Sequence, residues 1–164
     1  MLLRQIYIRI LVYKGKAVDI WSSSKYPGCA LSNLAPNGFV FEGIKCGSME
    51  GFLQSLKYRD RDEQRRICAL AGMEAKRMTT PQWQTDQTVW WNGESIDRQS
   101  AVFSELVSRV YSSLYHQNVC FREALNSTKG KKLFHSRGEQ NPYKTILTES
   151  EFIHILTQLR DNIG

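Results

Sequence analysis

The clearest pattern in the chain is residues 48–58, where polar and apolar side chains recur at helical spacing. Glu50, Gln54 and Lys57 follow one another at intervals of four and three residues, which aligns them on one stripe of a helix at about 100° per residue. The apolar side chains form a second stripe directly beside the first: Met49, Phe52, Leu53 and Leu56. Since a solvated face normally lies opposite the apolar face, this arrangement indicates the wall of a pocket at the edge of the core. The alternative is a row of ordinary surface residues with one weak Glu–Lys interaction.

Other segments also have the periodicity of helices. Ser48 is the expected N-cap of the first helix, and a second helix is predicted over residues 63–78, closed by Pro81. A long helix over residues 98–116 is expected at the centre of the core, followed by a shorter one over residues 119–126. The capping box Thr148-Glu149-Ser150-Glu151 predicts the start of a final helix.

Strand patterns are short and scattered. Residues 6–13 and 17–21 are rich in β-branched and aromatic side chains and predict two strands. Residues 39–45 predict a short hairpin, and residues 132–135 predict a further strand. Residues 85–91 fit neither class clearly.

Length and composition point to one soluble domain covering residues 1–164. Hydrophobic residues make up 41% and charged residues 23% of the chain, without repeats or low-complexity tracts. The four cysteines are widely spaced and predict neither a zinc site nor a disulfide framework. The apolar N-terminal segment is interrupted by Arg4 and Arg9 and is too short to span a bilayer, so we expect a cytoplasmic protein without a membrane segment.

Charge favours an anionic partner. The 22 Lys and Arg against 16 Asp and Glu give a net charge of +6, which suits phosphate or nucleic acid. The excess is greatest in residues 121–144, which contain six basic and two acidic side chains. Within this segment Lys129 and Lys131 lie in a basic turn that lacks the spacing of a P-loop, so a generic phosphate contact is expected there.

Three further features leave alternatives open. Trp90 and Trp91 precede a predicted turn, and at least one should be buried; the other either packs in the core or provides a stacking platform for a base or sugar. Asn33 can hydrogen-bond its own backbone before Pro36, an ordinary local role. The three histidines are scattered, and no Cys–His or Ser–His hydrolase arrangement is indicated.

Taken in order, several blocks of this sequence resemble the YbiA-like family, the NADAR superfamily linked to NAD and ADP-ribose. The most specific is Ser48-x-Glu50-x-Phe52-x-Gln54-x-x-Lys57-Tyr58. The others are Gly28-Cys29-Ala30-Leu31-Ser32-Asn33 with Phe39, Phe41 and Gly43; Ala75-Lys76-Arg77-Met78; Trp91 before a long helix; Leu125-x-x-Thr128 leading to Leu133; and Leu156-x-x-Leu159-Arg160. Together they cover about Ala17 to Arg160.

The resemblance implies a single compact, mainly helical α+β domain with a small β-sheet. It also implies metal-independent hydrolysis of an N-glycosidic bond to ribose, without a cofactor or an obligate protein partner. Two substrate groups are associated with the family: ADP-ribose attached to guanine in nucleic acid or nucleotide, and ribosylamino-pyrimidine phosphates of riboflavin synthesis. The positive charge favours the first group. The alternative from another class is a non-catalytic module that binds ADP-ribose or a nucleotide.

The resemblance also assigns roles to residues. Glu50 matches the acidic family residue and, in the first turn of its helix, is favoured as an anion by the helix dipole. It would activate water or stabilise the cationic ribosyl transition state, while Lys57 or a residue of the 139–141 loop assists the leaving base. Substrate contacts are expected from Asn33, Gln54, Lys76, Arg77, Trp90, Trp91, Lys129 and Lys131.

One position departs from the family pattern. Better-known members have an Asp in a loop before the last helix, whereas this chain has Glu139, Gln140 and Asn141. Asn141 aligns by spacing, but an amide cannot act as a general base. Either Glu139 substitutes, or Asn141 only orients the substrate, or activity is reduced.

Overall fold

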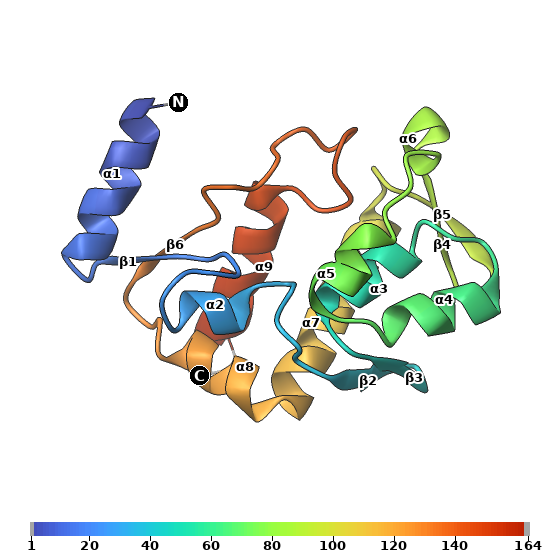
Figure 1. Cartoon of the computed structure of the whole chain (residues 1–164), viewed down its shortest axis with the longest axis horizontal. Coiled ribbons are helices and arrows are strands. Elements are labelled where there is room, and N and C mark those ends of the chain that lie inside the picture. Colours follow the sequence, from blue (N-terminus) through green and yellow to red (C-terminus); the bar gives the residue numbers. More distant parts are fainter. Residues whose placement is uncertain (1, 163–164) are drawn as a thin grey trace.

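A long buried helix, α7 (Ala101–Gln117), lies at the centre of the computed structural model, which describes residues 2–162. The other helices are α1 (Leu2–Tyr13), α2 (Gly28–Leu31), α3 (Met49–Ser55), α4 (Arg61–Cys68), α5 (Gly72–Arg77), α6 (Trp83–Asp86), α8 (Val119–Asn126) and α9 (Glu149–Asn162). The strands are β1 (Ala17–Asp19), β2 (Phe39–Phe41), β3 (Ile44–Cys46), β4 (Thr88–Trp91), β5 (Glu94–Asp97) and β6 (Lys132–Phe134). The predicted α+β class, with much more helix than strand, is confirmed (Figure 1).

The strands pair in three separate two-stranded ladders instead of one small sheet. β1 and β6 are parallel, with Ala17 opposite Lys132, so the basic turn near residue 130 is brought beside the N-terminal part of the chain. β2 and β3 form the predicted hairpin, and β4 and β5 form a second one. Asn92 and Gly93 both have positive φ in that second turn, as a tight hairpin requires.

The core is one continuous cluster around α7. Its apolar face is buried along its whole length, and α3 and α9 contribute further buried aromatic and aliphatic side chains. Phe52 of α3 packs against the rings of Phe41 and Trp91, with centroids 5.9 and 4.9 Å apart. The apolar stripe of α3 is therefore fixed, which determines where its polar stripe points.

The prediction of a strand over residues 6–13 is wrong, because α1 occupies this segment. Ile8 is its one fully buried side chain, and α1 contacts the body of the protein mainly along β1. Arg4 forms an ion pair with buried Glu149 of α9, and Gln5 Nε2 donates to the carbonyl of Ser136 at 3.1 Å. The helical spacing of these contacts outweighs the β-branched content of the segment.

The predicted helix over residues 63–78 is also wrong in extent, because it is broken into α4 and α5. Gly72 has a φ of +58°, a left-handed conformation that ends the helical run and that glycine adopts without strain. The chain turns here because the carbonyls of Cys68 and Leu70 pack on α3 instead of continuing a helix.

This contact explains why residue 51 is glycine. A Cβ on Gly51 would lie 2.5 Å from the carbonyl oxygen of Leu70 and 2.7 Å from that of Cys68. We expect Gly51→Ala to lower the free energy of unfolding by about 1–3 kcal/mol, measured by urea denaturation. Gly38→Ala is the matched control, because its Cβ would meet nothing closer than 3.7 Å. Equal stability of the two variants would contradict the packing argument.

Both predicted helix starts are confirmed. Ser48 Oγ accepts the backbone N–H of Gly51 at 3.0 Å and caps α3. At α9, Thr148 Oγ1 accepts the N–H of Glu151 at 3.2 Å, and Glu151 Oε2 accepts the N–H of Thr148 at 2.7 Å, which is a complete capping box.

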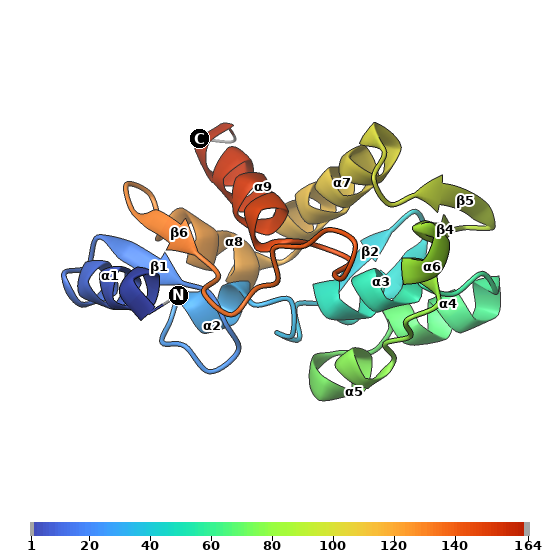
Figure 2. The same cartoon turned by 90° about the horizontal axis from the view of Figure 1, so that it is seen from above.

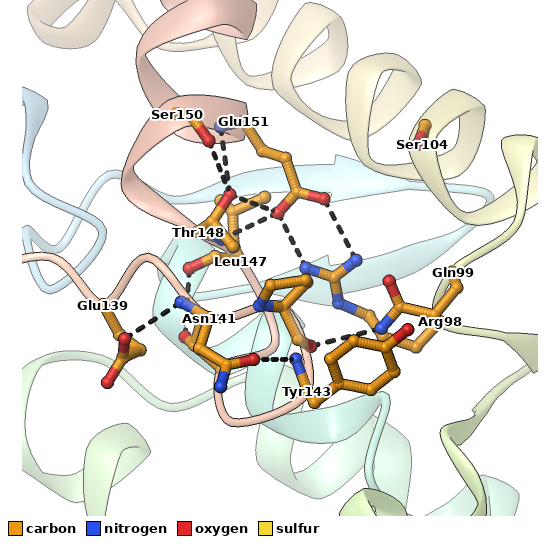
Figure 3. Close-up of polar contacts among 12 residues, drawn as sticks. Arg98, Gln99, Ser104, Glu139, Asn141, Tyr143, Leu147, Thr148, Ser150 and Glu151 are labelled. Atoms are coloured by element: carbon orange, nitrogen blue, oxygen red, sulfur yellow. Dashed lines mark hydrogen bonds and ion pairs between the residues drawn. The ribbon is translucent and has the colours of Figure 1, made fainter.

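Glu151 also holds the loop between β6 and α9 in place. Its carboxylate accepts two hydrogen bonds, at 3.0 and 2.7 Å, from the guanidinium of Arg98, which is 2% exposed (Figure 3). Next to this pair, Gln99 Nε2 donates to the carbonyl of Pro142 at 3.3 Å. Figure 2 shows the loop crossing the middle of the molecule and approaching α3. It forms the second wall of the site described next.

Candidate active site

A cavity of about 440 Å³ lies between α3, the loop that precedes α9 and the segment that follows β1. Six of the residues proposed from the sequence line it: Asn33, Glu50, Gln54, Lys57, Lys76 and Glu139. The polar stripe therefore faces a pocket and is not a plain surface row. The helix is shorter than the predicted segment 48–58, because α3 ends at Ser55 and Lys57 lies in the turn that follows.

Glu50 and Gln54 form the centre of this wall. Glu50 Oε1 accepts a hydrogen bond from Gln54 Nε2 at 2.8 Å. Gln54 is 6% exposed, and its Oε1 is buried without a hydrogen-bond partner in the described part of the chain. Turning the amide over would set two oxygens against each other, so the observed orientation is the favourable one. An unpaired buried carbonyl oxygen is costly, so the Gln54 side chain is held in place mainly by its hydrogen bond to Glu50.

Asn33 is held by a hydrogen bond from the core. The hydroxyl of the buried Tyr111 donates to Asn33 Oδ1 at 2.6 Å, and burial raises the pKa of this phenol well above its ordinary value. Tyr111 is therefore a fixed donor, which identifies Oδ1 as the inward atom of Asn33. The Asn33 amide nitrogen makes no hydrogen bond within residues 2–162 and can donate to a ligand in the pocket.

Lys57 is the titratable cation of the pocket. Burial lowers its pKa to about 8, an effect that the Glu50 carboxylate opposes. Its Nζ donates to Thr79 Oγ1 at 3.0 Å and lies 5.8 Å from the centre of the Trp83 ring. Lys57 and Glu50 both line the pocket but form no ion pair with each other in the described residues.

The pocket has a positive balance. Its lining contains four basic side chains, Lys57, Lys76, Arg137 and Lys144, against the carboxylates of Glu50 and Glu139. Arg137 lies flat on Trp21, with its Cζ 3.7 Å from the ring centre. One carboxylate deep in a pocket with cations around it suits a ligand that carries phosphates and reacts at a neutral or cationic centre.

The loop that was expected to supply a second acid is organised by its own backbone. Glu139 Oε1 accepts the N–H groups of Gln140 and Asn141 at 2.7 and 2.9 Å, and these bonds hold the pKa of Glu139 below its ordinary value. Asn141 Oδ1 accepts the N–H of Tyr143 at 3.0 Å (Figure 3). Asn141 shapes the loop and does not line the pocket, so we leave it out of the proposed catalytic group.

Five other residues proposed from the sequence lie outside the pocket lining: Arg77, Trp90, Trp91, Lys129 and Lys131. Trp91 is 5% exposed and donates its indole N–H to Glu42 at 2.8 Å, so the core alternative applies to it. Trp90 is half-buried beneath the guanidinium of Arg59, 5.0 Å from the ring centre. Neither of these two tryptophan rings is therefore available to stack on a ligand in this pocket.

The sequence pattern missed Trp21, Tyr111 and His135. Trp21 and His135 line the pocket next to β1 and β6, and His135 Nδ1 bonds the carbonyl of Ile20 at 2.6 Å. Only the pairing of these two strands, which are far apart in the sequence, brings these residues together. Arg137 and Lys144 belong to the basic segment that the charge distribution had singled out.

Within residues 2–162 no three His, Cys, Asp or Glu side chains are grouped as metal ligands, and no helix is long and apolar enough to cross a membrane.

Comparison with known proteins identifies the family of this chain. Residues 25–161 match the family model described as Bacteriophage protein GP30.3. A relative from Enterobacteria phage T4, the "Uncharacterized 17.1 kDa protein in Gp30-rIII intergenic region", is 40% identical over 149 residues, which cover 89% of this chain and 98% of the relative.

A solved structure supports the fold. The NMR structure of the E. coli protein YbiA superposes with a TM-score of 0.61 and covers 90% of this chain and 84% of that one, at 17% sequence identity. The resemblance to the YbiA-like family found in the sequence is thereby confirmed at the level of the fold.

Proposed function

This chain belongs to the bacteriophage protein GP30.3 family and has the fold of YbiA, and on that premise we propose that it hydrolyses the N-glycosidic bond between a ribose and a base. The observation that carries the proposal is the pairing of Glu50 with a deeply buried, half-satisfied Gln54 in a pocket lined by four cations. Such a site offers a carboxylate to the reacting sugar and positive charge to its phosphates.

The chemistry follows from the charges. Glu50 takes a proton from a water molecule, whose oxygen forms a bond to C1 of the ribose. The bond from C1 to the base nitrogen breaks, its electron pair stays with the base, and the base is protonated. Because positive charge develops on the sugar in the transition state, the carboxylate also stabilises it electrostatically.

Lys57 is the group we assign to protonate the leaving base. At neutral pH it is mainly charged, and with a pKa of about 8 it is a stronger acid than an ordinary lysine. The side-chain NH2 of Asn33 is assigned to a ribose hydroxyl as a donor, and Gln54 is assigned to orient the Glu50 carboxylate. Lys76, Arg137 and Lys144 are assigned to phosphates.

We favour ADP-ribose attached to guanine in a nucleic acid or nucleotide as the substrate. Two phosphates in one ligand match the several cations around a single pocket better than one phosphate does. The alternative substrate is a ribosylamino-pyrimidine phosphate, which is smaller and carries one phosphate group. To distinguish the two substrates, the protein is incubated with each compound and the released sugar is detected by chromatography. Release from neither compound would contradict the proposed activity.

A binding module is the second candidate, and one observation favours it. The loop before α9 presents no Asp, and Glu139 is already engaged by two backbone N–H groups. Saturable binding of the ADP-ribosylated substrate without release of ADP-ribose would favour this alternative over the hydrolase.

The activity should depend on the protonation of Lys57. Since its pKa is lowered to about 8, kcat/KM is expected to fall as pH rises through about 8, where the cation is lost. Lys57→Arg keeps the charge throughout this range, so its residual activity should lack the alkaline fall. A pH–rate profile measured between pH 6 and about 10 tests this, and an unchanged alkaline fall in the variant would exclude Lys57 as its source.

Tyr111 is a positioning residue in this account. Tyr111→Phe removes the hydrogen bond that orients Asn33 and should raise KM about fivefold, equivalent to one hydrogen bond of about 1 kcal/mol, with kcat nearly unchanged. Steady-state kinetics separates the two parameters. Tyr115→Phe is the control, because its hydroxyl bonds Asn126 away from the pocket. A fall in kcat with constant KM would contradict the positioning role.

A further inference from the structure

A second cavity of about 780 Å³ lies beside the first and shares Trp21 and Arg137 with it. One side is formed by α1, and the other by β1, the loop that follows it and the turn before β6. Figure 1 shows α1 at the edge of the molecule next to β1 and β6. Besides the Arg4–Glu149 ion pair, the edge of the Tyr7 ring packs on Phe134, with centroids 6.5 Å apart, so α1 is held as a fixed wall.

The charges in this second cavity are nearly all positive and come from separate elements. Arg9 is on α1, Lys25 follows β1, Lys131 precedes β6, and Arg137 borders the first pocket. The one carboxylate in the lining, Asp19, already accepts two hydrogen bonds from Ser136. The backbone N–H donates to Oδ1 at 2.9 Å and the hydroxyl donates to Oδ2 at 2.6 Å. The cations therefore have no free acidic partner within the lining.

Aromatic rings lie between these cations. Tyr26 is 62% exposed and Tyr13 is 93% exposed, and both line the cavity with Trp21. Exposed rings alternating with cations are the arrangement that binds a single-stranded nucleic acid, because bases stack on the rings and phosphates contact the cations. A small phosphate compound would need the cations but not the rings.

We propose that this second cavity binds a single-stranded stretch of nucleic acid next to the nucleotide being processed. The assignment rests on the proposed function, since it explains how a modified base within a strand reaches Glu50. The α1 wall precedes residues 25–161, the range matched by the family model.

The test measures the Kd of a fluorescein-labelled, unmodified 12-nucleotide single-stranded DNA for the full chain. Fluorescence anisotropy reports binding, and the titration is repeated over a range of salt concentrations. The double variant Arg9→Ala, Lys25→Ala should weaken binding about tenfold and reduce the slope of log Kd against log salt by about 1.4, for two phosphate contacts. Tyr26→Ala should weaken binding at least about fivefold through lost stacking. Lys45→Ala, Arg65→Ala is the control, because these exposed cations line neither cavity.

Equal binding by the wild type, the cavity variants and the control would overturn the proposal. Binding of vesicles containing anionic lipid, lost in the same variants, without binding of the oligonucleotide would also overturn it and would indicate a lipid surface instead. The probe carries no ADP-ribose, so its binding does not depend on turnover. Oligonucleotide binding without any glycosidase activity would refute the proposed function alone, and activity without oligonucleotide binding would refute this proposal alone.

Discussion

Glu50→Gln is expected to lower kcat for release of the ribosylated product by about a thousandfold, within the range that one general base contributes. The substitution keeps the size of the side chain and an oxygen that can still accept from Gln54 Nε2. It removes only the negative charge and the ability to take a proton. Substrate binding and the thermal unfolding temperature should therefore change little, and rapid-quench kinetics with saturating substrate measures the chemical step.

Glu123→Gln is the matched control for this substitution. Glu123 is exposed on α8 and lines neither cavity, so its variant should be as active as the wild type. Turnover by the Glu50 variant at the rate of this control would remove Glu50 from the mechanism.

The largest expected effect on stability comes from Glu151. Glu151→Gln leaves the guanidinium of Arg98 buried without its ionic partner. Removing one member of such a pair costs about 3 kcal/mol, which for a chain of this length lowers Tm by roughly 6–12 °C. The glutamine amide is uncharged and offers one acceptor oxygen where Glu151 offers two, and Arg98 Nε already lacks a hydrogen-bond partner. Calorimetry measures the change in Tm.

The same pair predicts a dependence on pH. Burial alone would raise the pKa of Glu151, but hydrogen bonds from Arg98 and Thr148 outweigh burial and leave it below its ordinary value. The pair therefore stabilises the fold above the pKa of the unfolded chain, and this contribution is lost as pH falls through the folded value. Urea denaturation at neutral and at acidic pH measures this effect. The free energy of unfolding should fall less between the two pH values in Glu151→Gln than in the wild type.

Glu63→Gln provides the control for Glu151. It breaks an ion pair with Arg66 that lies on the surface of α4, and exposed pairs of this kind contribute little. If both variants were equally stable, Arg98 and Glu151 would not be the anchor of the loop before α9.

The part of the site that was predictable from the sequence is the part encoded in α3 and the turn that follows it. The spacing of Glu50, Gln54 and Lys57 beside an apolar stripe is local information, and burial of that stripe forces the polar one into the pocket. The capping residues Ser48 and Thr148 were predictable for the same reason, because each bonds a backbone N–H three residues away.

The parts that could not be predicted depend on contacts between distant segments. The break between α4 and α5 arises where carbonyls of Cys68 and Leu70 meet Gly51, which no periodicity within residues 63–78 contains. The Tyr111–Asn33 hydrogen bond joins residues 78 positions apart. Trp21 and Arg137 meet only because β1 pairs with β6.

Two of the residue types singled out in the sequence were ambiguous for a physical reason. A tryptophan can pack in a core or stack on a ligand, and Trp91 packs because Glu42 accepts its indole N–H. A basic turn can contact phosphate wherever the fold carries it, and pairing of β1 with β6 brings Lys131 to the second cavity instead of to the Glu50 pocket.

Hydrolysis of a ribose–base bond in the Glu50 pocket can be followed by mass spectrometry of a defined substrate. An oligonucleotide carrying one ADP-ribosylated guanine is incubated with the wild type and, separately, with Glu50→Gln. The masses of the reaction products are then measured. The wild type is expected to yield free ADP-ribose and the intact, unmodified oligonucleotide in equal amounts, while the variant yields neither. An oligonucleotide that keeps its ADP-ribose in both reactions, or loses it equally in both, would contradict the account.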